Sequence, residues 1–192
     1  MAKDQQNPFK VVTPKFRVSF PDLFEPKSFN DQPAKFSVQM LFDKKADLTA
    51  LKKVANKAAS EKWGDKVPKG LHMPFKDGNE KELDGYEDKI VVSAASKFKP
   101  QVVDQKLNVI NDPEDLYAGC FARAAIVAYA WEQKDPKGKA VLKRGVSFNL
   151  ESVQKMAEGD PFKKAIDPSD TFDALDSDDD DSTAGVDEDF DL

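Results

Sequence analysis

The acidic residues of this 192-residue chain are concentrated at its C-terminal end, and this limits which part of the chain can fold. Asp167–Leu192 contains twelve Asp and Glu residues and no Lys or Arg. So few of its side chains are apolar that it cannot bury enough surface to offset the entropy lost on folding. We therefore predict a folded domain at residues 1–166 and a disordered acidic tail at residues 167–192.

The chain has a net charge of -6, but this total hides two parts of opposite sign. The first 166 residues hold all 29 basic residues and 23 of the 35 acidic ones, a net charge of +6. A basic domain joined to an acidic tail is typical of nucleic-acid-binding proteins. We expect the tail to compete with nucleic acid for the basic surface.

Composition argues against several classes of protein. No apolar run approaches the roughly 18 residues that a membrane span needs. The N-terminal MAKDQQNPFK lacks the apolar stretch of a signal peptide. A single cysteine, Cys120, cannot form an internal disulfide and fits a reducing compartment. We therefore expect no membrane partner and a cytoplasmic location.

Short β-like segments dominate the domain. Lys10–Phe20 is rich in Val and Phe and predicts a first strand that ends at Pro21, followed by a turn-rich connection. Lys35–Phe42 alternates polar and apolar residues and predicts a half-buried strand. Further extended segments are expected at Lys89–Phe98, in part at Val102–Ile110, and at Tyr117–Trp131 and Val141–Leu150. Leu150–Gly159 predicts short helical turns.

One helix is expected among these strands. Asp47 is a candidate N-cap for a helix that runs to about Trp63. Its predicted apolar stripe consists of Leu48, Leu51, Val54, Ala55, Ala58 and Ala59. A long irregular stretch, Gly64–Asp88, follows it. This order of elements favours a mainly β fold, a small barrel with an inserted helix, over a doubly wound α/β sheet.

Catalytic motifs are weak. The single histidine, His72, lies in the long irregular stretch, Cys120 is flanked by small residues that favour a buried thiol, and P-loop, GxGxxG and CxxC motifs are missing. Asp112, Glu114 and Asp115 could bind a metal in a nuclease, but turn formation around Pro113 explains them at least as well. We expect no cofactor and no enzymatic activity.

Aromatic and basic residues interleave in several segments, as in proteins that bind single strands by stacking bases above a basic groove. In Tyr117–Trp131, alternation places Tyr117, Phe121, Arg123, Tyr129 and Trp131 on one side, and Cys120, Ile126 and the even-numbered alanines on the other. The sequence leaves open which side is core. The candidate DNA-binding residues are Arg17, Lys97, Phe98, Lys99, Arg123, Tyr129, Trp131, Lys143 and Arg144.

Two apolar side chains end the acidic tail, in the order Asp187, Glu188, Asp189, Phe190, Asp191 and Leu192. This pattern predicts a docking motif, in which acids steer the segment to a basic patch and the two apolar side chains fill a pocket. An alternative function is a protein-interaction scaffold whose acidic tail mimics nucleic acid.

Several stretches together resemble a phage-encoded single-stranded DNA-binding family: MPFKDGNEKELDGYED, KFKPQVVD, DLYAGCFARAAIVAYAW and KRGVSFNLESVQKMAEGDPF. The resemblance covers about Phe9 to Phe162, and GVSFNLESVQK is its most specific part. The layout is also similar to that of the replication single-strand binding proteins of short-tailed coliphages. The resemblance implies an OB-fold-like five-stranded antiparallel barrel with an inserted helix, and sequence-tolerant binding of single-stranded DNA.

The resemblance further implies a role in phage DNA replication or recombination in the host bacterial cytoplasm, with replication or recombination proteins recruited through the tail. The aromatic-x-Trp pair of these proteins falls on Tyr129 and Trp131, and their terminal aromatic falls on Phe190, although Leu192 follows it here. A homo-oligomer is compatible with the sequence.

Overall fold

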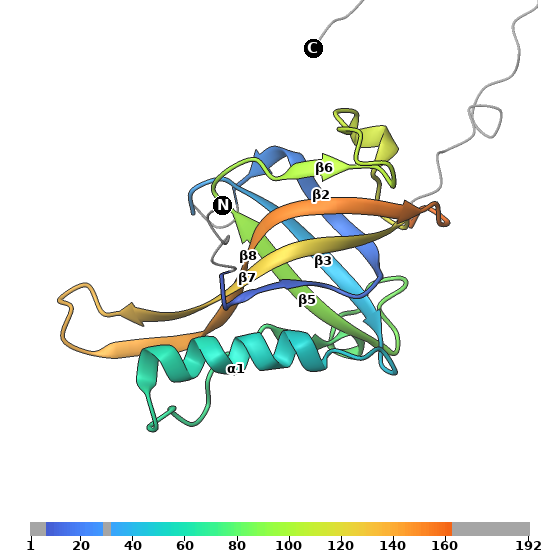
Figure 1. Cartoon of the computed structure of the whole chain (residues 1–192). Coiled ribbons are helices and arrows are strands. Elements are labelled where there is room, and N and C mark those ends of the chain that lie inside the picture. Colours follow the sequence, from blue (N-terminus) through green and yellow to red (C-terminus); the bar gives the residue numbers. More distant parts are fainter. Residues whose placement is uncertain (1–6, 29–31, 163–192) are drawn as a thin grey trace, which may run out of the picture.

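The computed structural model describes residues 7–28 and 32–162 (Figure 1). The predicted tail, including Asp187–Leu192, lies outside these residues. One helix, α1 (Thr49–Trp63), is joined by eight strands: β1 (Lys10–Val12), β2 (Phe16–Lys27), β3 (Lys35–Asp43), β4 (Phe75–Asp77), β5 (Lys89–Ser96), β6 (Gln101–Val103), β7 (Phe121–Lys134) and β8 (Val141–Ala157).

Five of the strands close into a ring. β7 pairs with β2, β2 with β3, β3 with β5, β5 with β8, and β8 returns to β7. A small five-stranded barrel of this kind is OB-fold-like. The predicted mainly β barrel with an inserted helix is therefore confirmed. Four of its pairings are antiparallel as expected, and the closing pair, β5 with β8, is parallel.

Side chains of β7 alternate between the inside and the outside of the barrel. The inner side consists of small and apolar residues that are at most 3% exposed: Ala122, Ala124, Ile126 and Ala128, preceded by Cys120. Burial raises the pKa of the Cys120 thiol. The question that the sequence left open is therefore answered, because the small residues form the core and the side that carries Arg123 and Tyr129 faces outward.

Helix α1 lies along one end of the barrel and contacts both β7 and β8 (Figure 1). Its buried residues, Leu51, Ala55, Ala58 and Ala59, belong to the predicted apolar stripe. At its C-terminal end the Trp63 indole Nε1 donates a hydrogen bond to Glu132 Oε1 of β7 at 2.8 Å. No helix in the described part of the chain has the length and apolarity needed to cross a membrane.

The predicted end of the first strand at Pro21 is wrong. β2 continues to Lys27, and its register with β3 shifts between Ser19, which is opposite Gln39, and Asp22, which is opposite Ser37. Two residues of β2 thus face one residue of β3, which is a β-bulge. A bulge leaves a residue outside the hydrogen-bonded ladder, so a proline without an N–H is tolerated there.

The helical turns predicted for Leu150–Gly159 are also wrong, because β8 is one strand of 17 residues. Leu150 and Val153 are each 1% exposed, and Ser152 pairs with both β6 and β7. Helix formers such as Gln and Lys differ from other residues by only a few tenths of a kcal/mol in intrinsic preference. Pairing on both edges of the strand and burial of its apolar residues exceed that preference.

Two local differences from the sequence-based expectation are smaller. The helix begins at Thr49, so Leu48 rather than Asp47 holds the N-cap position. Asp47 still accepts a hydrogen bond from the Thr49 N–H at 3.0 Å, as a capping side chain does. The stretch Gly64–Asp88 is not wholly irregular, since it contains β4 and a single 3-10 turn at Gly78–Glu80.

The described chain ends beside the start of β7, where Gly119 allows a close backbone approach. Gly119 has a φ of 116°, and a Cβ there would lie 2.2 Å from the Asp160 carbonyl oxygen. Arg17 holds the same contact together, because its Nε donates to the Gly119 carbonyl at 3.1 Å and its Nη2 donates to the Asp160 carbonyl at 2.7 Å.

We expect Gly119→Ala to destabilise the protein more than Gly138→Ala. Gly138 also has a positive φ, 68°, but its surroundings are open, so alanine there should cost only the backbone strain of about 1–2 kcal/mol. Displacement of the 159–162 backbone should add about 1–3 kcal/mol for Gly119→Ala. Urea unfolding of both variants measures the difference, and equal losses would contradict the close approach.

Candidate nucleic-acid interface

An open groove of ≈ 420 Å³ crosses the outer face of the barrel from β3 over β5 and β8 to β7. Its position follows from the closed ring, because Ala95 of β5 lies beside Asn149 of β8, and Asn149 lies opposite Val127 of β7. The residues that line it are Lys35, Ala95, Ser96, Lys97, Phe98, Val127, Tyr129 and Asn149. Three of the sequence-predicted residues, Lys97, Phe98 and Tyr129, therefore lie in one groove.

Two of the residues that line the groove are exposed aromatics. Phe98, in the turn after β5, is 83% exposed, and Tyr129 of β7 is 46% exposed. The turn is held by a hydrogen bond from the Phe98 N–H to Ser96 Oγ at 3.1 Å. Folding has thus left two large aromatic side chains in water within one groove, and exposed apolar surface of this kind marks an interaction site.

Cations accompany the aromatics. Lys35 and Lys97 line the groove, and Lys99 is exposed in the same turn as Phe98. None of the ion pairs found among residues 7–28 and 32–162 involves these three ammonium groups. An anion that entered the groove would therefore meet unneutralised positive charge beside the aromatic side chains.

Trp131 lies next to the groove on the same outer side of β7 as Tyr129. Its Nε1 donates to Ser147 Oγ at 2.9 Å, and its ring is stacked on His72, with ring centroids 6.2 Å apart and planes 17° apart. The ring also covers Gly145, where a Cβ would lie 3.0 Å from its Cζ2 atom. Trp131 is therefore half-buried and held in place, whereas Tyr129 and Phe98 are free to meet a ligand.

Lys143 and Arg144 face opposite sides of β8, as alternation predicts. Lys143 is exposed and opposite Gln133, on the side of Trp131. Arg144 is half-buried and opposite Glu132, on the side of α1. The hydrogen bond from Trp63 lowers the pKa of the Glu132 carboxyl, and the charge of Arg144 contributes to that shift. Arg144 therefore faces away from the groove.

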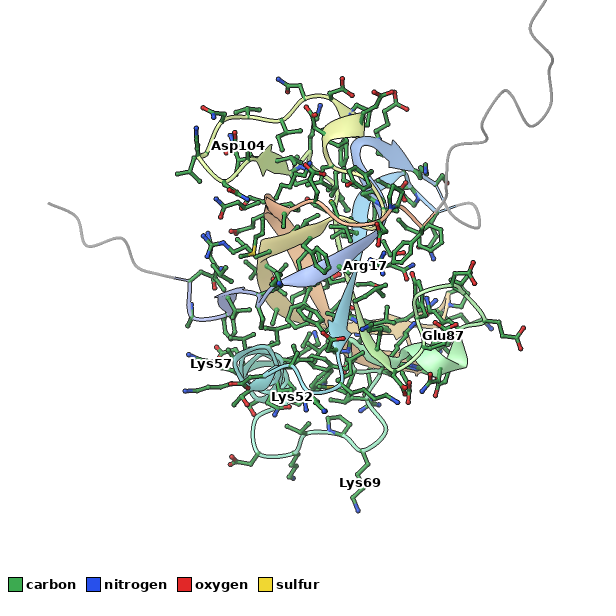
Figure 2. The ribbon with its side chains drawn as sticks, turned by 90° about the vertical axis from the view of Figure 1, so that its right-hand side faces the viewer. Arg17, Lys52, Lys57, Lys69, Glu87 and Asp104 are labelled. Atoms are coloured by element: carbon green, nitrogen blue, oxygen red, sulfur yellow. The ribbon has the colours of Figure 1, made fainter. Side chains whose placement is uncertain are left out.

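The structure places Arg17 and Arg123 apart from the groove. Arg17 donates to the carbonyls of Gly119 and Asp160, and its guanidinium lies 4.3 Å from the centre of the Phe162 ring (Figure 2). These contacts hold the end of the described chain against the barrel. Arg123 is exposed and donates to Gln154 Oε1 at 2.8 Å. It is six residues from Tyr129, or about 20 Å along the strand.

Sequence reasoning missed several residues of this face. Lys35 enters the groove through the pairing of β3 with β5, and Asn149 enters it through the closing pair of β5 with β8. No local pattern marks either residue. In the middle of β3, Gln39 Oε1 accepts hydrogen bonds from Tyr86 at 2.9 Å and Lys81 at 3.2 Å. Partial burial, with Lys76 nearby, lowers the pKa of the Lys81 ammonium. This network covers the part of the outer face beyond the groove.

Asp112, Glu114 and Asp115 form a turn. Asp112 Oδ1 accepts a hydrogen bond from the Glu114 N–H at 2.9 Å and begins the 3-10 turn Pro113–Asp115. Among the residues that the structure describes, no group of three or more His, Cys, Asp or Glu side chains could hold a metal. The hydrogen bond therefore supports the turn interpretation of these carboxylates.

Comparison with known proteins links this fold to phage proteins. The model of a family described as "Enterobacter phage Enc34, ssDNA-binding protein" matches residues 9–183. Protein p50 of Acyrthosiphon pisum secondary endosymbiont phage 1 is 31% identical over 166 residues, which cover 80% of this chain and 86% of that protein.

Two solved structures share the fold. The single-stranded DNA-binding protein from bacteriophage Enc34, in complex with single-stranded DNA, superposes with a TM-score of 0.63 at 22% identity, over 81% of this chain and 90% of that one. The single-stranded DNA-binding protein gp2.5 of bacteriophage T7 has a TM-score of 0.57 at 14% identity, over 91% of this chain and 98% of that one.

Exposure predicts how three aromatic residues contribute to stability. Because Phe98 and Tyr129 are exposed, Phe98→Ala and Tyr129→Ala should leave the free energy of unfolding within about 0.5 kcal/mol of the parent protein. Trp131→Ala should lower it by about 1–3 kcal/mol, because it removes packing on Gly145 and leaves Ser147 without its partner. Urea unfolding measures all three, and a large loss for Phe98→Ala would contradict its exposed position.

Proposed function

Because the chain belongs to the Enterobacter phage Enc34 single-stranded DNA-binding protein family, we propose that it binds single-stranded DNA in the groove between Phe98 and Tyr129. The observation that carries this proposal is the pair of exposed aromatics beside Lys35, Lys97 and Lys99, which make no ion pair in the described structure. Bases stack on the aromatics, and phosphates neutralise the ammonium groups. Every base has a π-face, so such binding is tolerant of sequence.

The position of the groove supports the proposal. OB folds bind oligonucleotides on the face of their second and third strands and on the loops that join the first strand to the second and the fourth to the fifth. In this barrel those strands are β3 and β5, which supply Lys35 and Ala95 to the groove. Tyr129 lies on β7, the fourth strand, in the half that leads to the β8 hairpin.

We further propose a biological role that goes beyond membership of the family. The protein coats single strands during phage DNA replication or recombination in the host bacterial cytoplasm, without catalysing a reaction. Residues 1–166 form the DNA-binding domain and residues 167–192 a disordered tail. The tail competes with DNA for the groove, and Asp187–Leu192 recruits replication or recombination proteins, with Phe190 and Leu192 as the docking side chains.

Loss of either groove aromatic should weaken binding of oligo-dT. Phe98→Ala and Tyr129→Ala should each cost about 1–3 kcal/mol for the lost stacking of one base. Because stacking releases no counterions, both variants should keep the parental slope of log K against log salt, whereas Lys97→Gln should reduce it by about 0.7. Fluorescence anisotropy over a salt series measures both quantities.

Leu107→Ala is the matched control, since Leu107 is 69% exposed and lies in the turn after β6 rather than in the groove. It should bind as the parent does. A parent protein without salt-dependent affinity for single strands would instead favour the scaffold function.

Removal of residues 167–192 should strengthen binding of oligo-dT at low salt, because twelve carboxylates then no longer compete with phosphates. The gain should shrink at high salt, since the Debye length falls from about 10 Å at 0.1 M to about 3 Å at 1 M. A full-length variant with the tail carboxylates changed to amides controls for chain length. Equal or weaker binding by the truncated protein would refute the competition.

A further inference from the structure

Helix α1 presents a strongly basic surface that the groove does not include. Lys52, Lys53, Lys57 and Lys62 are exposed on it, and Glu61 is its single acidic residue. The ion pairs found in the described ranges involve none of these four lysines. Figure 2 shows Lys52 and Lys57 pointing into solvent from the helix, and Lys69 below them on the following loop.

This arrangement is unfavourable for the helix on its own. Lys53 and Lys57 are four residues apart, so their charges lie side by side on one face and repel each other. The helix is retained because its apolar stripe packs on the barrel. A row of exposed lysines that form no ion pair among the described residues is the complement of a polyanion.

The basic surface is continuous with the proposed DNA groove. A second hollow of ≈ 260 Å³ lies between α1 and β7, and it is lined by Phe9, Ala58, Glu61, Lys62, Ala128, Tyr129 and Ala130. Tyr129 therefore borders both hollows. On the far side of the second hollow, Lys57 Nζ lies 5.7 Å from the centre of the Phe9 ring. A strand that leaves the groove at Tyr129 thus meets Lys62 and then Lys57.

We propose that α1 is a second binding surface for the same DNA strand, contacting its phosphates through Lys53, Lys57 and Lys62. This inference rests on the proposed function and extends it, because it assigns a path to the part of the strand that leaves the groove. The contacts are to phosphates, because Tyr129 already belongs to the groove and Phe9, the other aromatic residue of the second hollow, is half-buried beside Lys57. The α1 surface therefore increases the affinity for strands long enough to extend beyond the groove. It does not change the affinity for short strands that occupy the groove alone.

Strand length separates the two surfaces. One OB fold covers about 4–16 nucleotides, so dT6 should occupy the groove alone and dT16 should also reach α1. The full-length variant Lys53→Gln/Lys57→Gln/Lys62→Gln should bind dT6 as the parent does and dT16 several-fold more weakly. Its slope of log K against log salt on dT16 should fall by about 2, because three phosphate contacts are lost at about 0.7 each.

Two further variants control for charge. Glu61→Gln removes the acid beside Lys62 and should strengthen binding of dT16 without changing that of dT6. Lys106→Gln removes one exposed lysine in the turn after β6. Lys106 is next to Asp104, which lies at the opposite end of the molecule from α1 (Figure 2), so this variant should bind dT6 and dT16 as the parent does. Circular dichroism should show unaltered helix content for all variants, because every change is at an exposed position.

Three outcomes overturn the inference. If the triple variant and the parent bind both lengths alike, α1 does not contact DNA. If the triple variant loses affinity equally for dT6 and dT16, α1 instead holds the acidic tail away from the groove. If the parent binds neither strand, the proposed function itself is wrong, and this result is distinct from the first two.

Discussion

The antiparallel pairing of β7 with β8 is the contact on which both the core and the candidate interface depend. It runs from Phe121 opposite Ala157 to Lys134 opposite Val141. Because side chains alternate, the register that buries Ala124 and Ile126 also directs Tyr129 outward. A slip of one residue would exchange the two faces and would remove the core and the groove together. The parallel pair of β5 and β8 then closes the ring and brings the Phe98 turn to the same groove.

Patterns that depend on neighbouring residues predicted much of the fold. Alternation identified β3 and the two faces of β7, and apolar spacing identified the buried side of α1. Alternation did not show which face of β7 is buried, because alanine is compatible with both the core and the surface. Closure of the barrel determines which face points inward. The strand end at Pro21 and the helical turns at Leu150–Gly159 are wrong predictions, because both segments depend on tertiary pairing. A bulge accommodates Pro21, and pairing on both edges keeps Leu150–Ala157 extended.

The candidate site was predicted only in part, because local patterns do not show which distant segments the fold brings together. Lys97 and Phe98 are adjacent in sequence, and Tyr129 joins them in one groove, but Lys35 and Asn149 come from distant segments. Arg17 is next to an aromatic residue in the sequence, as Lys97 is, yet its guanidinium donates to two backbone carbonyls. Sequence reveals the charge of a side chain and not whether the fold has already supplied its partners.

Photocrosslinking tests the central claim most directly, because it reports which side chains lie against the bases. An oligo-dT that contains iododeoxyuridine is bound to the full-length protein, irradiated and digested, and the modified residues are identified by mass spectrometry. The proposed groove predicts adducts at Phe98 and Tyr129 that an excess of unlabelled oligo-dT abolishes. Competed adducts confined to aromatics outside the groove, such as the exposed Phe20 of β2, would contradict it.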